Sequence, residues 1–387
     1  MTTSDKIAEL RARKARLRAG GGDKRIEKQH SAGKLTARER IDRLVDDDTF
    51  QEMFLFSGHR CRRFGMGDKE LPADGVVTGV GAVDGRQILV ASQDFTVAGG
   101  SVGEVHANKI AAVQDYALKI GAPLVLINDS GGARIQEGID ALSGYGRIFY
   151  RNVLLSGVVP QISIVSGPCA GGAAYSPALM DFIIMVQRVG KIFITGPQVI
   201  KEVTGEEVTD EDLGGADAQE ARSGVIHLVA ETDEHALLMA KELLSYLPSN
   251  NVEPPPRVEP TDDPARADPA LDTLVPPQES QSYNIRGAIA GIFDLGSFFE
   301  VHARFAPNAV VGFARLHGEA VGVVANQPAW MAGVLDINAS DKIARFVRFC
   351  DAFNLPLITF VDCPGFMPGS VQEHGGIIRH GAKIVYA

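Results

Sequence analysis

Two stretches of this sequence end in glycine turns that could hold a reacting oxygen. Residues 123–134 and residues 160–176 each begin with a short, nearly continuous apolar run, as expected of a strand that is buried on both faces. Each run stops at a turn of small residues, and we expect a helix to follow it. Glycine lets a ligand approach the backbone closely, and the first N–H groups of a helix have no partner within the helix.

Two such turns side by side could donate two N–H groups to a single oxygen, which is the arrangement of an oxyanion hole. An ordinary strand-to-helix connection is the alternative for either turn alone. The presence of both turns, together with the repeat described below, favours the oxyanion hole.

Other chemistries find less support in the sequence. No G-x-S-x-G elbow surrounds Ser130 or Ser166, so a hydrolase of that type is not indicated. Cys169 lies inside the second glycine turn and could be a nucleophile, but no histidine partner can be placed from spacing, which favours a small packed residue. The nine histidines form no H-x-x-x-H pair, so we expect no metal site. No complete phosphate-binding G-x-x-x-x-G-K-[ST] motif occurs either.

The composition predicts a globular chain of two domains. Its 387 residues are enough for two cores, and the net charge of -10 argues against general nucleic-acid binding. The four cysteines are scattered and suggest no disulfide framework, which fits a reducing cytoplasm. No apolar run approaches the roughly 18 residues of a membrane span, and the start of the chain lacks the apolar centre of a signal peptide. We therefore expect a cytoplasmic protein without a membrane segment.

Residues 1–43 are predicted to form a basic, helical N-terminal arm. The arm carries 13 Lys or Arg against 6 Asp or Glu, and the spacing of Ile7, Leu10 and Leu17 indicates a helix that ends at the glycines of residues 20–22. Two roles remain open for it. The arm could meet a polyanionic ligand such as the phosphates of a coenzyme, or it could be a solvated helix that caps the fold.

Residues 44–247 read as an α/β domain with crossover connections. Short strands at residues 75–80 and 87–92 flank Asp84-Gly85, a hairpin signal, and an apolar-periodic helix follows at residues 105–120. Residues 247–277 hold 9 of the 20 prolines, so a linker is predicted at residues 248–277. A second domain then occupies residues 278–387.

The second half of the chain repeats the first at a constant offset of 233 residues. The matched positions include a turn, a helix, a strand start and an Asp-x-x-Gly motif: Asp84 with His317, Lys109 with Lys342, Pro123 with Pro356, Asp129 with Asp362, and Gly132 with Gly365. This pattern predicts a duplicated domain. The offset places the second glycine turn of the second copy beyond Ala387, so we expect that copy to be incomplete.

A duplicated fold with a glycine turn in each copy suggests two oxyanion holes. A reaction that needs two would move a group between two carbonyl-like oxygens. Backbone donors would stabilise an enolate on one side and polarise a carbonyl on the other.

Eight segments carry long motifs, and two of them overlap the glycine turns. They are residues 21–30 (GGDKRIEKQH), 91–96 (ASQDFT), 129–138 (DSGGARIQEG), 167–173 (GPCAGGA), 193–197 (FITGP), 335–338 (LDIN), 344–351 (ARFVRFCD) and 375–383 (GGIIRHGAK). These segments resemble the biotin-dependent acyl-CoA carboxyltransferase family. The resemblance covers nearly the whole chain. Within that family it is most similar to propionyl-CoA carboxylase β chains and methylmalonyl-CoA carboxyltransferase large subunits. The zinc-finger carboxyltransferases of bacterial acetyl-CoA carboxylase are a poorer match, because their four-cysteine site is absent.

The resemblance implies two crotonase-like (ClpP/crotonase) ββα-superhelix domains, assembled as a hexamer from dimers. It places the active site between the first domain of one subunit and the second domain of its dimer partner. The implied cofactor is carboxybiotin, carried by a biotin carboxylase or biotin carboxyl carrier subunit and not attached to this chain. No side-chain base is then needed, since the ureido nitrogen of biotin takes the α-proton of an acyl-CoA while backbone donors hold the enolate.

The resemblance also implies site residues. It assigns the thioester oxygen to N–H groups of Gly171 and Gly172, with Gly131 and Gly132 bordering the same site. It further implies substrate contacts at Ala133, Ala170, Ala173, Asn326 and Gln327, and biotin contacts at Gly365 and Phe366, with no metal. Cys363, beside the biotin turn, replaces an aliphatic residue that is usual in the family.

Three functions remain open. The leading one is carboxyl transfer between carboxybiotin and a short acyl-CoA, with propionyl-CoA and methylmalonyl-CoA as the favoured pair. The second is a subunit of a methylmalonyl-CoA decarboxylase, which works with a membrane partner. The third is a truncated acyl-CoA-binding or assembly module without transfer activity. Because the second turn of the biotin site is expected beyond Ala387, the sequence predicts that this chain alone does not complete the transfer.

Overall fold

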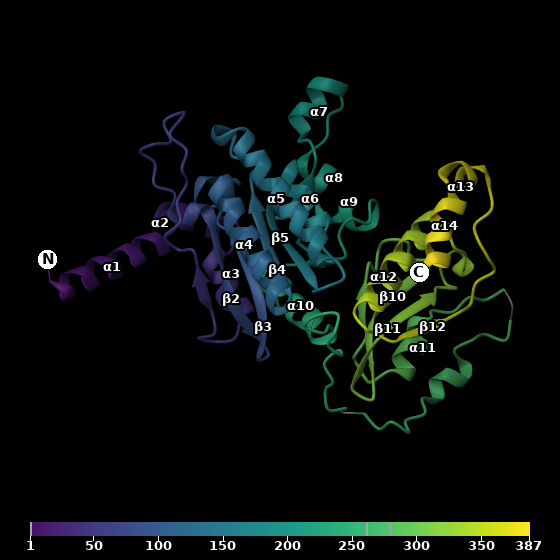
Figure 1. Ribbon diagram of the computed structural model, residues 1–387. Coiled ribbons are helices and arrows are strands. Elements are labelled where there is room, and N and C mark those ends of the chain that lie inside the picture. Colours follow the sequence, from purple (N-terminus) through teal and green to yellow (C-terminus); the bar gives the residue numbers. More distant parts are fainter. Residues whose placement is uncertain (1, 261, 279) are drawn as a thin grey trace. The chain divides into compact units, whose positions relative to one another are not determined.

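The computed structural model describes residues 2–260, 262–278 and 280–387. Met1, Thr261 and Glu279, which belong to the predicted arm, linker and second domain, lie outside the described residues. The chain divides into two compact units (Figure 1). The first runs to Gln219 and includes Val229–Lys241, and the second comprises Glu220–Leu228 and Glu242–Ala387.

The first unit is built on a mixed sheet of eight strands in which β1 to β6 and β8 follow one another and β7 pairs with β5. The strands are β1 (Gln51–Met53), β2 (Val76–Val83), β3 (Arg86–Gln93), β4 (Leu124–Ser130), β5 (Gln161–Ala170), β6 (Phe182–Val186), β7 (Lys191–Phe193) and β8 (Leu228–Ala230). Strands β3 to β6 are parallel, and every residue of β4 is buried. The apolar run of β4 is therefore that of a strand covered on both faces.

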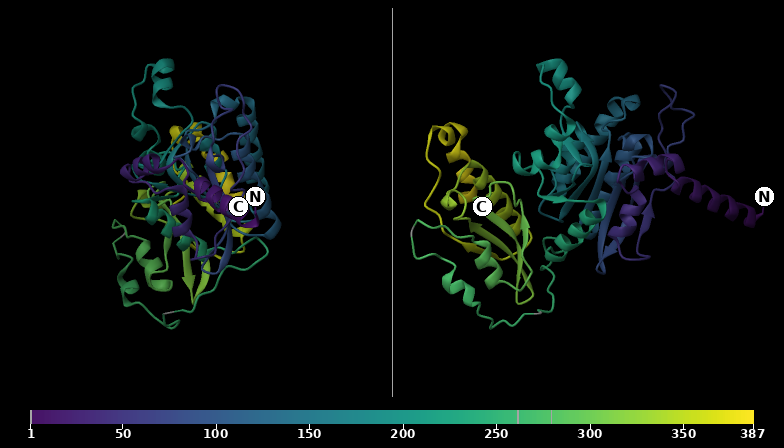
Figure 2. Two further views of the ribbon diagram at one scale, coloured as in Figure 1. Left: turned by 90° about the vertical axis from the view of Figure 1, so that its left-hand side faces the viewer. Right: turned by 180° about the vertical axis from the view of Figure 1, so that it is seen from behind.

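Ten helices accompany this sheet in the described part of the chain. They are α1 (Thr3–Arg18), α2 (Asp23–Ser31), α3 (Ala37–Leu44), α4 (Glu104–Ile120), α5 (Ile139–Leu155), α6 (Gly172–Ala178), α7 (Pro197–Thr204), α8 (Asp210–Gly214), α9 (Ala216–Ala221) and α10 (Asp233–Tyr246). Helix α1 extends away from the sheet of the first unit (Figure 2, right view), and only Leu17 of it is buried. No helix of the described residues is both long and apolar enough to span a membrane.

The second unit contains a sheet in the order β12-β11-β10-β9. Its elements are β9 (Phe299–Val301), β10 (Ala309–Leu316), β11 (Glu319–Asn326), β12 (Leu357–Phe360), α11 (Arg286–Ile292), α12 (Ile337–Ala352), α13 (Ser370–Gly375) and α14 (Ile377–Tyr386). As in β3 and β4 of the first unit, β11 and β12 are parallel.

The predicted duplication is confirmed by the positions of these elements. Strands β2 and β3 reappear as β10 and β11 with the same offset at both ends. The isolated bridge Val102–Ala133 recurs at the same offset as Leu335–Phe366. Lys109 and Lys342 are also equivalent: each is buried and donates to backbone carbonyl oxygens just before or at the start of β2 or β10. The α/β, two-copy architecture predicted from the sequence is therefore the observed one.

The predicted domain ranges differ from the two units in two places. The boundary falls inside α10, between Lys241 and Glu242, and the segment Glu220–Leu228 belongs to the second unit. There the N–H of His302 donates to the carbonyl oxygen of His227 at 2.9 Å, and Arg304 pairs with Glu220 at 3.0 Å. Such pairings join residues about eighty positions apart, so composition gives no sign of them.

Candidate functional site

The ends of β4 and β5 bring the two glycine turns together. Ser130 and Cys169 are register partners across these parallel strands. A Cβ atom built on Gly132 would lie 3.2 Å from the carbonyl oxygen of Ala170. The structure thus places Gly131, Gly132 and Ala133 beside the turn of residues 170–173.

The hydrogen bonds within the turns decide which N–H groups can serve a ligand. Gly131 donates to the Gly99 carbonyl oxygen at 2.9 Å, and Gly171 donates to the Phe193 carbonyl oxygen at 3.1 Å. Gly132 donates to the Ser130 hydroxyl at 3.1 Å. Ala133 and Gly172 are both half-buried, and within the described residues their N–H groups have no acceptor. Among the half-buried residues of the two turns, these two N–H groups, one from each turn, are therefore available to a ligand.

The first turn is held at its start by Asp129, a fully buried carboxylate. Lys34 Nζ donates to Asp129 Oδ1 at 2.7 Å, while Arg40 and Gln29 donate to Oδ2 at 3.0 and 2.9 Å. Burial lowers the pKa of Lys34, and the charge of Asp129 opposes that shift. Three donors from the N-terminal arm thus fix the carboxylate that precedes Ser130.

Arg40 ties both strand ends to a third element. Besides Asp129 on β4, its guanidinium donates to the Ser166 carbonyl oxygen on β5 and to Asp233 at the start of α10, each at 3.0 Å. Burial alone would lower the pKa of Arg40, but Asp129 and Asp233 outweigh it and raise the pKa, so the guanidinium stays charged. One side chain therefore links the strands that carry the two turns.

The end of the first turn is held by Arg134, which is also buried. Its NH1 pairs with Asp74 at 2.6 Å and with Glu137 at 2.8 Å, and its NH2 donates to the Ser101 carbonyl oxygen at 2.8 Å. Burial raises the pKa of the Asp74 carboxyl, and the charge of Arg134 opposes that rise. With Asp129 and Arg134 both clamped, the backbone between them has little freedom to move.

We expect Gly167→Ala to destabilise the first unit through Asp129. A Cβ at this position would lie 1.9 Å from Asp129 Oδ1, and three donors keep that carboxylate from moving away. Overpacking of this kind costs about 1–3 kcal/mol, which urea unfolding would measure. Gly146→Ala, where nothing lies within 4 Å of the new Cβ, is the matched control and should not destabilise. Equal unfolding midpoints in both variants would contradict the clamp.

In the second unit, the predicted substrate residues use their polar groups internally. Asn326 donates to the Gly333 carbonyl oxygen at 3.0 Å. Gln327 accepts from the Ile285 N–H and donates to Asn284 Oδ1. Both side chains are more than nine-tenths buried, so they hold the loop after β11 in place.

The backbone of the predicted biotin turn is uncrowded at Gly365. Gly365 has φ +134°, and a Cβ there would have no neighbour within 4 Å. Phe366 is 49% exposed, and its ring lies against Gly381 of α14. These residues lie where the first turn lies in the other copy, since the Leu335–Phe366 bridge is the counterpart of Val102–Ala133.

Cys169 lies in the core of the first unit. Cys169 is fully buried, and burial raises the pKa of its thiol far above its usual range, so it is an inert packed residue. Among the described residues, no three His, Cys, Asp or Glu side chains gather as metal ligands would.

The sequence did not single out Lys34, Arg40 or Tyr145 as site residues. Lys34 and Arg40 belong to an arm whose charge predicted solvent or a ligand, yet they are buried beneath the first turn. The arm therefore caps the fold at least at these residues. The only local sign of this burial in the sequence is that Lys34 and Arg40 adjoin the apolar residues Leu35 and Ile41.

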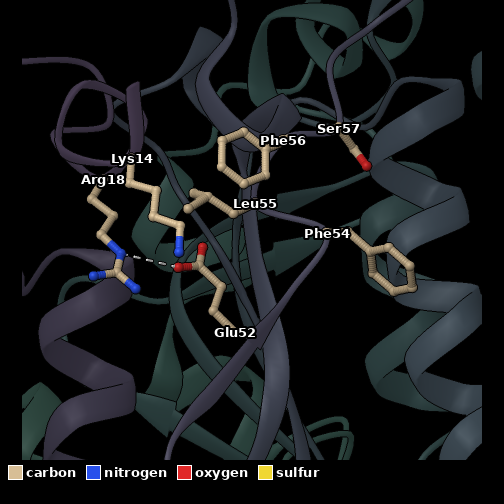
Figure 3. A pocket seen from close by; sticks show the side chains of 7 residues that line it. All are labelled: Lys14, Arg18, Glu52, Phe54, Leu55, Phe56 and Ser57. Atoms are coloured by element: carbon tan, nitrogen blue, oxygen red, sulfur yellow. Dashed lines mark ion pairs between the residues drawn. The ribbon is translucent and has the colours of Figure 1, made fainter. Parts of the chain in front are cut away.

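A surface hollow lies between α1 and the segment after β1 (Figure 3). It is lined by Lys14, Arg18, Glu52, Phe54, Leu55, Phe56 and Ser57. Arg18 Nε lies 3.5 Å from Glu52 Oε2, and Arg38 pairs with the same carboxylate at 2.7 Å. Lys14, Arg18 and exposed aromatic rings thus border the hollow. The carboxylate in its lining, Glu52, is already paired with arginine side chains.

Comparison with known proteins places the chain in a family. The carboxyl transferase domain matches residues 28–387. The methylmalonyl-CoA decarboxylase subunit alpha of Veillonella parvula is 57% identical over 386 residues, which are 100% of this chain and 76% of that protein. The carboxyltransferase subunit of propionyl-CoA carboxylase from Haloferax mediterranei is 58% identical over 387 residues, which are 100% of this chain and 75% of that protein.

A solved structure agrees with these relatives. The transcarboxylase 12S hexamer with methylmalonyl-coenzyme A and methylmalonic acid bound superposes with a TM-score of 0.98 at 55% identity, covering 100% of this chain and 75% of that one. The crotonase-like fold implied by the sequence motifs is confirmed. The chain belongs to the carboxyl transferase family and is a carboxyltransferase of the kind found in acyl-CoA carboxylases.

Proposed function

We propose that the protein moves a carboxyl group between carboxybiotin and a short-chain acyl-CoA, with propionyl-CoA and methylmalonyl-CoA as the favoured pair. The observation that carries this proposal is the pair of available N–H groups at Ala133 and Gly172, on turns that lie side by side. Relatives named for propionyl-CoA carboxylase and methylmalonyl-CoA carboxyltransferase support the choice of substrate.

In this mechanism the thioester oxygen accepts from the N–H groups of Ala133 and Gly172. As the α-proton leaves, charge moves to that oxygen, and fixed donors stabilise it more than they stabilise the ground state. The clamped residues Asp129 and Arg134 keep the Ala133 N–H in place, and the Gly171–Phe193 hydrogen bond keeps Gly172 in place. Gly131, Ala170 and Ala173 are small, so they let the thioester approach the two N–H groups.

The second unit offers residues that fit a flat, neutral ring such as that of biotin. The open backbone at Gly365 and the half-exposed ring of Phe366 would bind it, and Asn326 and Gln327 would support the loop nearby. Carboxybiotin, when bound, would supply the carboxyl group, and the ureido nitrogen freed of that group would be the base for the α-proton.

The proposal is tested by acyl-CoA binding and by carboxyl transfer. We expect propionyl-CoA and methylmalonyl-CoA to bind in calorimetry more tightly than free coenzyme A. We also expect transfer from methylmalonyl-CoA to biotin in a protein that carries this chain together with the second turn of the biotin site and is assembled with its biotin-carrying partner. A chain that binds neither thioester would refute the proposal.

A decarboxylase subunit is the second candidate, because the Veillonella parvula relative and a Propionigenium modestum relative are named as such. Both functions use the same acyl-CoA chemistry, so the partner decides between them. Co-purification with a membrane protein, and release of the carboxyl group as carbon dioxide, would favour the decarboxylase.

We further propose a homo-oligomer, with a hexamer built from dimers as the expected form, and a location in the cytoplasm. The structural relative is described as a hexamer. Exposed apolar side chains on α5, including Ile139, Tyr150 and Val153, are the kind of surface that a subunit contact covers. The partner would be a biotin carboxylase or biotin carboxyl carrier subunit. All four cysteines are unpaired, which supports a reducing compartment.

The hollow of Figure 3 gives the basic arm a testable role. If Lys14 and Arg18 attract the phosphates of coenzyme A, the double variant Lys14→Gln/Arg18→Gln should raise the KM for acyl-CoA roughly fivefold at low salt. The increase should shrink as salt rises, because exposed charges are screened. Lys119→Gln on α4 is the control. An unchanged KM at low salt would leave the arm as a cap only.

A further inference from the structure

Tyr145 of α5 lies against the second turn. The residue is 5% exposed, and a Cβ built on Gly172 would lie 3.2 Å from the Cγ and Cδ2 atoms of its ring. Its other neighbour is Phe149, whose ring centroid is 5.7 Å away. The aromatic ring is thus wedged behind the residue whose N–H faces the proposed thioester oxygen, and a glycine at position 172 is what lets it come so close.

The hydroxyl of the same side chain is buried, and within the described residues it has no hydrogen-bond partner. Burial raises the pKa of the phenol, and the Ser130 side chain opposes that rise. Ser130 Oγ in turn accepts from the N–H of Gly132, the residue before Ala133.

We propose that Tyr145 is a positioning residue that sets the two N–H donors relative to each other. Its ring supports Gly172, and its hydroxyl donates to Ser130 Oγ once the thioester is bound, which holds Gly132 and hence Ala133. Hydrogen bonds at such sites are commonly loose without ligand and tighten in the complex. This inference rests on the proposed function, because it concerns the oxygen that those N–H groups hold.

Tyr145→Phe removes only the hydroxyl and keeps the ring on Gly172. Loss of one neutral hydrogen bond corresponds to about a three- to tenfold change, and we expect it in kcat, with KM changed less than about twofold. A second readout needs no transfer activity: the carbonyl stretch of bound [1-¹³C]propionyl-CoA in difference infrared spectra. We expect it at lower frequency in the wild-type complex than in free propionyl-CoA, and shifted less in the variant.

Tyr116→Phe, on an exposed tyrosine of α4, is the control and should match the wild type in both readouts. Ser130→Ala completes a double-mutant cycle. If the hydroxyl acts through Ser130, adding Tyr145→Phe to Ser130→Ala should change kcat no further. Additive effects would overturn the Ser130 connection, and an unshifted carbonyl stretch with unchanged kcat in Tyr145→Phe would overturn the proposal. Absence of any carbonyl shift in the wild type would instead refute the proposed thioester site.

Discussion

Replacing Gly172 by proline should lower the rate of carboxyl transfer about a hundredfold or more. Proline has no N–H, and loss of one oxyanion donor costs about 10²–10³ in kcat. Helix α6 begins at Gly172, and proline is accepted at the first position of a helix, so the backbone there need not unfold. The effect should appear in kcat, measured with methylmalonyl-CoA as donor, because the donor acts most strongly in the transition state.

The matched control for this variant is Gly172→Ala. It adds the same Cβ, 3.2 Å from the Tyr145 ring, but keeps the N–H. A loss seen with proline and largely absent with alanine would assign the effect to the donor. Equal losses in the two variants would assign it to crowding against Tyr145, and an unchanged rate in a folded proline variant would remove Gly172 from the site.

Replacing Arg40 by methionine should destabilise the first unit by about 3–5 kcal/mol. The guanidinium is fully buried and pairs with Asp129 and Asp233, each at 3.0 Å. Its removal leaves two buried carboxylates with fewer partners, and breaking a buried pair by deleting one side costs about this much. Asp233 Oδ1 already lacks a hydrogen-bond partner within the described residues, so this oxygen offers no hydrogen bond that would compensate for the loss of Arg40. Urea unfolding, followed by circular dichroism, measures the change.

Arg43→Met on the same helix is the control. Arg43 lies 4.0 Å from Glu234, and both side chains are about half exposed, so the pair should contribute less than about 1 kcal/mol. Similar losses in the two variants would mean that Arg40 contributes only as another arm charge. A stable Arg40→Met protein that keeps its acyl-CoA affinity would show that the two strand ends hold their spacing without it.

The sequence by itself was enough for the architecture. Apolar runs, the Asp84-Gly85 turn and helical periodicity act locally, so they predicted the positions of β2, β3, α4 and β4 to within about three residues. The duplication was also visible, because two copies of one fold need the same residue types at the same spacing. That offset returned in the strand ends and in the equivalent lysines Lys109 and Lys342.

The sequence also located the turns but not their donors. Glycine at positions 171 and 172 predicted a backbone that a ligand can approach, and nothing local distinguishes the two N–H groups. The fold distinguishes them by placing the Phe193 carbonyl oxygen 3.1 Å from the Gly171 nitrogen, which leaves the Gly172 N–H as the proposed donor to the thioester oxygen. Ala133 becomes its counterpart in the same way, because Gly131 and Gly132 donate to Gly99 and Ser130.

Burial of charge was decided by tertiary structure alone. Lys34 and Arg40 read as solvated arm residues, because basic side chains are normally exposed. In the fold they are buried with Asp129, about ninety residues further along the chain, and their desolvation is offset by that carboxylate. Likewise, Glu220–Leu228 belongs to the second unit because His227 and Glu220 meet partners at residues 302 and 304. Local propensity cannot encode contacts between residues so far apart, because their energy exists only once the chain has folded.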